Sequence, residues 1–189
     1  MSARVLVAGI GNMLLGDDGF GVEVARRLSS MALPDDIEVM DAGIRGLHLA
    51  YRIADGCELL IAVDAVRRGG TPGTVYLIAP EIAEEDGAAT AAAGGGGSGG
   101  GFHGSAAPDA HGMDLESVFA VVRSLGASIP HVLLVGCEPA SVEERVGLSA
   151  AVARAVEPAM ARILDMARLL VEGDADEVGN QFMEAGDGP

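Results

Sequence analysis

Two hydrophobic patterns alternate along this chain: short runs of consecutive apolar residues, and longer stretches in which apolar residues recur every three or four positions. The first pattern is typical of buried strands and the second of helices with one buried face. The runs predict strands at about residues 3–9, 37–41, 59–64, 74–79 and 131–136. The periodic stretches predict helices at about residues 19–31, 45–54, 114–125 and 149–171. Because Pro158 interrupts the last apolar face, we expect a kink there or two helices in tandem.

The alternation of strands and helices predicts an α/β fold, a three-layer α/β/α sandwich with helices on both faces of a mostly parallel sheet. One strand is expected to break the pattern. Only nine residues, 65–73, separate the third and fourth runs, whereas a parallel crossover needs about a dozen or more. The fourth strand should therefore run antiparallel to its neighbours.

The length of 189 residues suits a single domain, which we expect to span residues 1–171. Two segments depart from the packed pattern. Residues 84–110 include seven glycines among the eight residues 94–101, which predicts a flexible inserted loop. The loop is either a tolerated surface insertion or a flap beside His111, which follows it. Residues 172–189 carry acids and no base, so we expect a disordered tail.

The chain is strongly acidic, with a formal charge of −16 at pH 7. Nucleic acids and anionic membranes bind basic patches, so neither is an expected partner. No run approaches the roughly 18 apolar residues of a membrane span, and the first residues do not resemble a signal peptide. The two cysteines, Cys57 and Cys137, lie far apart without the spacing of a ligand pair, which suits a reducing compartment. We expect a soluble, cytoplasmic protein without membrane insertion.

A glycine-rich turn follows the first predicted strand, from Gly9 to Gly21, and contains the adjacent acids Asp17 and Asp18. Such a turn between a strand and a helix usually lets a phosphate approach the backbone. Two carboxylates at this place would repel a pyrophosphate. Moreover, Leu14 stands where the dinucleotide fingerprint requires its third glycine. The turn therefore favours a cation site or acid–base chemistry over dinucleotide binding.

Candidate reactive residues lie where predicted strands and the loop end. Asp18 follows the first strand, Asp41 ends the second, Asp64 ends the third, and His111 ends the loop. In doubly wound sheets, ligands bind at the carboxyl ends of the strands. Two carboxylates and an imidazole could ligate Ni, Zn, Mn or Fe, and two nearby carboxylates could also act as acid and base. His103 is a rival ligand within the loop.

Each candidate also has a simpler interpretation. Asp17 and Asp18 could cap a helix, Asp64 could cap a turn, and His111 could be an exposed side chain. His48 and His131 are expected at the surface, and Cys137 is expected to be an inert core thiol. The chain contains neither a Gly-x-Ser-x-Gly elbow nor a His-Glu-x-x-His helix, which argues against elbow-type serine hydrolases and zincins.

Taken in order, these segments resemble the hydrogenase maturation proteases. The resemblance covers about residues 3–170, apart from the glycine-rich loop. It rests on Gly9-Ile10-Gly11-Asn12 with Gly21, Asp41-Ala42-Gly43, Ile61-Ala62-Val63-Asp64-Ala65, His111 before a Leu-rich helix, Gly136-Cys137-Glu138-Pro139, Gly147-Leu148-Ser149 and Val156-Glu157-Pro158. Two departures are Asp18, where the family often has Glu, and a longer loop before His111.

The resemblance implies an endopeptidase that clips a C-terminal extension from the large-subunit precursor of a [NiFe] hydrogenase after nickel insertion. It also implies a twisted five-stranded sheet between helices. The family's metal-contacting positions carry over onto Asp18, Asp64 and His111, with nickel supplied by the precursor rather than held by the free enzyme. Asp18, Asp64 and Asp41 are then the candidates for exchanging protons during hydrolysis, of the aspartic type or with assistance from the metal.

Two alternatives remain open from the sequence. The first is a metal-dependent chaperone that holds the nickel-loaded precursor without hydrolysing it, because metal ligation and catalysis use the same residue types. The second, less favoured, is a Rossmann-type dinucleotide-binding protein, which would bind a nicotinamide dinucleotide and be indifferent to nickel.

Overall fold

The computed structural model describes residues 3–80, 82 and 115–172. The strands lie close to the predicted runs and are β1 (Val5–Ile10), β2 (Ile37–Gly43), β3 (Leu59–Ala65), β4 (Val75–Ile78) and β5 (His131–Cys137). The helices are η1 (Gly16–Gly19, a 3-10 turn), α1 (Phe20–Leu28), α2 (Gly46–Ala54), α3 (Leu115–Ser124) and α4 (Ala150–Glu172). The inserted loop at 84–110 and almost all of the predicted tail at 172–189 lie outside the described residues.

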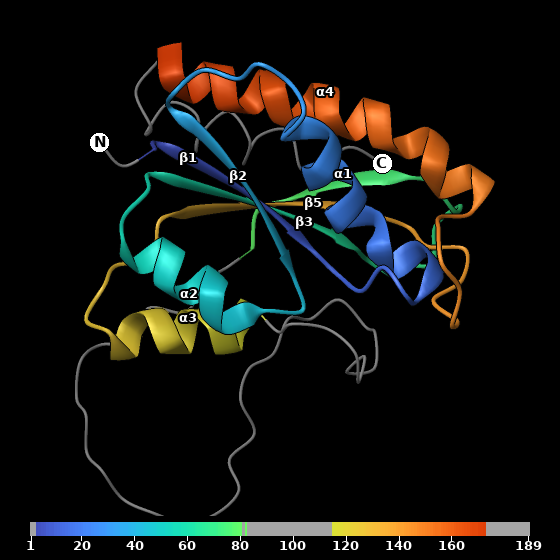
Figure 1. Cartoon of the computed structure of the whole chain (residues 1–189), viewed down its shortest axis with the longest axis horizontal. Coiled ribbons are helices and arrows are strands. Elements are labelled where there is room, and N and C mark those ends of the chain that lie inside the picture. Colours follow the sequence, from blue (N-terminus) through green and yellow to red (C-terminus); the bar gives the residue numbers. More distant parts are fainter. Residues whose placement is uncertain (1–2, 81, 83–114, 173–189) are drawn as a thin grey trace, which may run out of the picture.

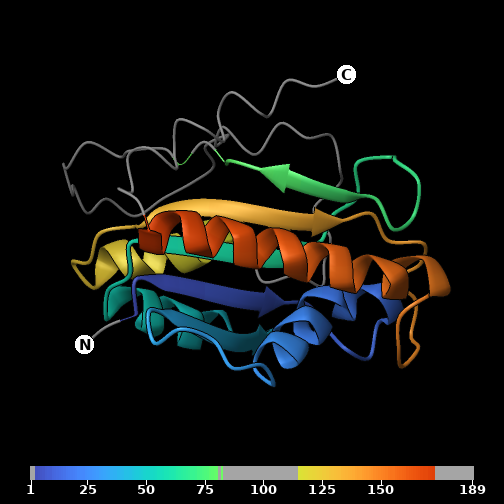
Figure 2. The same ribbon diagram turned by 90° about the horizontal axis from the view of Figure 1, so that it is seen from above.

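The five strands form one sheet in the order β2-β1-β3-β5-β4. β1 pairs in parallel with β2 and β3, and β3 pairs in parallel with β5. β4 pairs with β5 in the antiparallel sense, as the short connection predicted. Figure 2 shows β4 pointing opposite to its neighbours at one border of the sheet, with β2 at the other. The carboxyl ends of the four parallel strands therefore share one edge, here called the carboxyl edge; the opposite edge is the amino edge.

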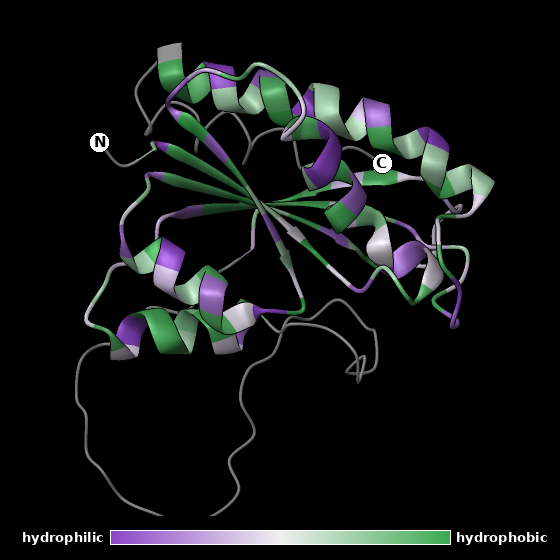
Figure 3. Cartoon of the chain, viewed as in Figure 1, coloured by the Kyte–Doolittle hydropathy of each residue, from purple (hydrophilic) through white to green (hydrophobic). Residues whose placement is uncertain are grey.

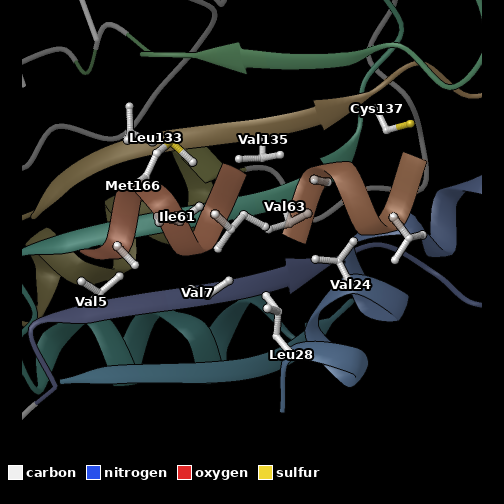
Figure 4. Close-up of a cluster of buried hydrophobic side chains, with 14 of the residues drawn as sticks. Val5, Val7, Val24, Leu28, Ile61, Val63, Leu133, Val135, Cys137 and Met166 are labelled. Carbon is white, nitrogen blue, oxygen red and sulfur yellow. The ribbon is translucent and has the colours of Figure 1, made fainter. Parts of the chain in front are cut away.

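Helices cover both faces, which confirms the three-layer α/β/α sandwich. Figure 1 shows α1 and α4 on one face and α2 with α3 on the other. The strands are green, that is apolar, along most of their length in Figure 3. Strand alternation sends Val5, Val7, Ile61 and Val63 into the cluster under α1 and α4 (Figure 4). The intervening residues of these strands enter a second cluster under α2 and α3.

Helix α1 packs directly on the backbone of the sheet because two glycines meet at the crossing. A Cβ atom at Gly21 would overlap the carbonyl oxygens of Val63 and Ile10, and one at Gly9 would overlap the carbonyl oxygen of Gly21. No larger residue fits without moving the helix away. This close packing fixes where α1, and the turn that precedes it, lie relative to β1 and β3.

Helix α4 differs from its prediction. It runs without interruption from Ala150 to Glu172 with Pro158 inside it, so the expectation of two helices in tandem is wrong. Pro158 and Arg154, whose carbonyl would accept from the missing N–H, are both exposed. Water can satisfy that carbonyl, and the buried face of the helix stays continuous. None of the described helices is long and apolar enough to cross a membrane.

Candidate active site

The turn after β1 is shaped by Gly11, which has a φ of 121°. A Cβ atom here would overlap the carbonyl oxygen of Asp18 and would lie 3.6 Å from Oδ1 of Asp64. The backbone N–H of Gly11 donates to the carbonyl of Gly43 at the end of β2 (3.1 Å). Gly11 therefore joins the ends of three neighbouring segments, and only glycine combines this φ with this approach.

Asp18 lies in η1 and is half-buried. Its Oδ2 accepts a hydrogen bond from the backbone N–H of Asn12 (2.7 Å). This bond reaches back across the glycine turn to the residue that follows Gly11. The carboxylate of Asp18 is thus held over the end of β1 and remains partly open to solvent.

Asp64 is the penultimate residue of β3 and is also half-buried. Its Oδ1 accepts from the backbone N–H of Ala65 (2.7 Å) and lies against Gly11. Alternation along the strand places Asp64 on the same face as Leu60 and Ala62, the face covered by α2 and α3. The structure therefore brings Asp64 and Asp18 to the same glycine turn, as predicted from their positions.

Asp41 lies farther out, on β2 at the border of the sheet. β2 continues to Gly43, and a bulge opposite Gly9 and Ile10 leaves Asp41 exposed. Arg45 lies 3.9 Å from its carboxylate and also donates to its carbonyl (2.8 Å). Asp41 therefore lies at the same edge of the sheet as Asp18 and Asp64, but unlike them it is exposed and has the guanidinium of Arg45 beside it.

The histidine candidates divide into two groups. His111 and its rival His103 lie outside the described residues. His48 and His131 are exposed, as predicted. Within the described residues, no three His, Cys, Asp or Glu side chains are close enough to hold a metal ion. Asp18 and Asp64 carry carboxylate oxygens at the glycine turn, and their ligation of a metal together with a third protein ligand stays a prediction.

Asp17 is the residue whose role the sequence did not predict. It is fully buried, and its carboxylate accepts from the backbone N–H groups of Ala140 (2.8 Å), Ser141 (3.2 Å) and Ser149. It caps neither η1 nor α1, so the capping interpretation is wrong for Asp17. Burial raises the pKa of Asp17, but the three backbone donors outweigh burial and bring the pKa below its ordinary value.

Glu138 also joins two loops: it begins the loop between β5 and α4 and binds the loop between β3 and β4. It is 5% exposed and accepts from the backbone N–H groups of Arg68 (2.8 Å) and Gly69 (3.2 Å) and from the Tyr76 hydroxyl (2.8 Å). Burial raises the pKa of Glu138, whereas these donors lower it by more. Cys137, beside it, is buried in the core, and burial raises its thiol pKa to about 12, so the predicted inert thiol is confirmed.

Backbone hydrogen bonds join the glycine turn to the loop between β5 and α4. Gly16 donates to the carbonyl of Arg145 (2.7 Å), and Arg145 donates to the carbonyl of Leu14 (2.9 Å). The N–H of Asp17 donates to the carbonyl of Ser141 (3.0 Å). With the Asp17 carboxylate, these bonds hold the two loops together as one wall beside Asp18.

Two half-buried carboxylates, Asp18 in η1 and Asp64 on β3, meet the same glycine turn at the carboxyl edge of the sheet. Carboxylates so placed are typical of sites that bind a cation or exchange protons with water. This turn does not suit a dinucleotide, because the carboxylate of Asp18 accepts the Asn12 N–H at the turn where a dinucleotide fold binds its pyrophosphate.

Comparison with known proteins identifies the family. The family model for hydrogenase maturation proteases matches residues 22–91 and 102–166. The hydrogenase 2 maturation protease of Escherichia coli K12 is 31% identical over 162 residues, covering 85% of this chain and 88% of that protein. The hydrogenase expression/formation protein HupD of Rhodobacter capsulatus is 34% identical over 165 residues, covering 87% and 67%.

Solved structures agree with the sequence relatives. The hydrogenase maturating endopeptidase HybD from Escherichia coli superposes with a TM-score of 0.62 at 28% identity, covering 90% of this chain and 94% of that one. The chain belongs to the hydrogenase maturation protease family and is a peptidase. The matched segments include Asp41, Asp64 and His111, and they begin just after the glycine turn.

Proposed function

We propose that this protein is the endopeptidase that removes the C-terminal extension of a [NiFe] hydrogenase large-subunit precursor after nickel has been inserted. The observation that carries the proposal is that Asp18 and Asp64 meet the same glycine turn in a member of this protease family. Both side chains are half-buried, so they are held in place and still open to a substrate.

We propose further that nickel is part of the substrate, held by the precursor, and that Asp18, Asp64 and His111 contact it from outside. Support for His111 comes from the chain path. Helix α3 covers the sheet face that carries Asp64, and it begins at Leu115, four residues after His111. Four residues span at most about 14 Å. Because α3 leads into the start of β5, the first residue of α3 lies toward the carboxyl edge, the edge that also carries the two carboxylates.

Hydrolysis of the peptide requires a water molecule to add to the carbonyl carbon and a proton to reach the leaving amine. A carboxylate beside the scissile bond can accept the proton from water and return it to the nitrogen. We propose Asp64 and Asp18 for this exchange because both are half-buried at the glycine turn, whereas the exposed carboxylate of Asp41 lies 3.9 Å from the guanidinium of Arg45. Asp17 is excluded from the exchange because its oxygens already accept three backbone hydrogen bonds.

The deciding experiment compares the intact mass of a nickel-loaded large-subunit precursor before and after incubation with this protein. A nickel-free precursor is the control. A single C-terminal loss with nickel alone supports both the cleavage and its dependence on the metal. Stable, nickel-dependent binding without a mass change would instead support a chaperone, and equal cleavage of both precursors would contradict metal recognition.

A further inference from the structure

Exposed apolar side chains gather at the carboxyl edge of the sheet. Nine large apolar residues among those that the structure describes are exposed. Five of them lie in the segments that follow β1, β2 and β5, and we call these five the apolar rim: Met13, Leu14, Ile44, Leu47 and Val146. Single exposed apolar residues are common on proteins, but a cluster of them commonly marks an interaction surface.

The rim is continuous with the reactive carboxylates. Met13 and Leu14 lie between Gly11 and Asp18 in the chain. Ile44 directly follows Gly43, whose carbonyl accepts from Gly11. These exposed side chains therefore border the turn at which Asp18 and Asp64 lie.

One part of the rim is preformed. Leu14 and Val146 come from different loops, but the loops are joined through the hydrogen bond from Arg145 to the carbonyl of Leu14 (2.9 Å). The buried carboxylate of Asp17 holds the same two loops together. A surface that is ordered before binding loses little conformational entropy when a partner covers it.

A pocket opens between these loops. It has a volume of about 260 Å³, and its lining includes Met13, Val146, Leu148 and Ala153 together with Gly16 and Gly19. The ion pair of Glu23 and Arg27 closes one side. Apart from this ion pair the lining side chains are apolar, and Glu23 and Arg27 already satisfy one another, so the pocket favours an apolar side chain over a charged one.

We propose that the apolar rim is the docking surface for the polypeptide of the precursor beside its scissile bond, with one apolar side chain of the precursor in the pocket. The inference rests on the proposed function, since it names how that substrate is held. The rim borders the carboxylates that must meet the substrate. A second copy of this chain would cover Asp18 and Asp64 if it sat there, so it is not the occupant.

The test is the steady-state cleavage of nickel-loaded precursor by Val146→Asp and Leu14→Asp. Their side chains are 75% and 63% exposed, so neither change should disturb the fold. Matched controls are Leu125→Asp and Leu169→Asp, which are 46% and 44% exposed and lie at the ends of α3 and α4, at the amino edge. We expect the rim variants to lower kcat/KM about tenfold or more, mainly through KM, because one apolar contact is replaced by a desolvated charge. The controls should match the unmodified protein.

The alternatives give different results. Equal kcat/KM for rim and control variants, with the unmodified protein active, would overturn the docking surface and leave the proposed function intact. A lower unfolding temperature for Val146→Asp would overturn it too, by showing that the chain itself covers this side chain. A dimer of the unmodified protein that Val146→Asp dissociates would assign the rim to self-association. If the unmodified protein does not cleave, the proposed function fails and the inference fails with it.

Discussion

The two edges of the sheet hold their charged groups in different ways. At the amino edge, Arg4 pairs with Glu58 and Arg52 pairs with Glu38, each at 2.8 Å between side chains that are partly exposed. At the carboxyl edge, Asp17 and Glu138 are buried and accept from backbone N–H groups of loops. The ion pairs at the amino edge join side chains at the surface, whereas the buried carboxylates at the carboxyl edge hold the loops of the candidate site in place.

The same contrast holds between two adjacent residues. Asp17 has its carboxylate in the interior and binds a loop, whereas Asp18 is half-buried beside Asp64. Asp17 joins the two loops, whereas the carboxylate of Asp18 remains partly open to solvent. The position of a carboxylate relative to backbone donors, rather than its residue type, decides which task it performs.

The largest expected effect is on catalysis. Asp64→Asn keeps the shape of the side chain but removes its charge and its ability to accept a proton. We expect cleavage of nickel-loaded precursor to fall by about 10²–10⁴-fold, with little change in the free energy of unfolding. Asp41→Asn should lose less, because Asp41 lies on the border strand beside Arg45. The measurement is kcat by timed mass spectrometry, and an equal loss in both variants would contradict this ranking.

The next effect is on stability. Asp17→Asn replaces one carboxylate oxygen by an NH₂ group that faces backbone N–H donors, so at least one buried donor loses its acceptor. We expect the free energy of unfolding to fall by about 3 kcal/mol. Asp18→Asn is the matched control, because it makes the same change one residue away at a half-buried side chain. It should cost about 1 kcal/mol or less, and equal losses in a urea titration would show that Asp17 does not anchor the loop.

A somewhat smaller loss of unfolding free energy is expected where α1 packs on the sheet through Gly21 and Gly9. Gly21→Ala places a methyl group on the carbonyl oxygens of Val63 and Ile10, so α1 must move outward. We expect a cost of about 2 kcal/mol. Gly126→Ala is the control: it also alters a glycine, at φ 74°, but nothing lies within 4 Å of the added carbon. Its cost should be about 1 kcal/mol, from backbone strain alone. Thermal unfolding of the two variants compares crowding with strain.

The next prediction concerns pH: acid should lower the free energy of unfolding by a smaller amount than the two substitutions above, through the carboxylates at the carboxyl edge. The pKa values of Asp17 and Glu138 are lowered from ordinary values of 3.8 and 4.5. A lowered folded pKa means that the unfolded chain binds the proton first. The stabilisation is therefore complete above these ordinary values and is lost as pH falls through the lower folded pKa values. We expect the free energy of unfolding to decline below about pH 4.5. In Asp17→Asn the decline should be shallower, and an identical pH profile would contradict the assignment.

The strands, the helices and the strand-end acids could be predicted because each has a local signature. Apolar periodicity reports burial, and carboxyl ends of parallel strands meet at one edge. The burial of Asp17 and its bonds to the loop between β5 and α4 had no local signature in the sequence. Its donors are backbone N–H groups 123 to 132 residues away in the chain, and every residue except proline carries that group. The alternative of two tandem helices at Pro158 was wrong for another reason: Pro158 is exposed, so the backbone hydrogen bond it lacks is on the solvent side and α4 continues through it.

The smallest expected effect tests the amino edge. Arg4 makes a two-point contact with Glu58, with Nε at 2.9 Å and Nη2 at 2.8 Å from its carboxylate oxygens. The side chains are 31% and 46% exposed, so water and salt screen most of their attraction. We expect Glu58→Gln to lower the free energy of unfolding by about 0.5 kcal/mol, and by less in high salt. The measurement is a urea titration at low and high salt, with Asp17→Asn alongside. The exposed guanidinium of Arg145 lies 4.0 Å from Oδ1 of Asp17, but the closer partners are three backbone donors in the interior. The loss at Asp17 should therefore change less with salt than the loss at Glu58, and an equally salt-sensitive loss would remove the distinction between the two edges.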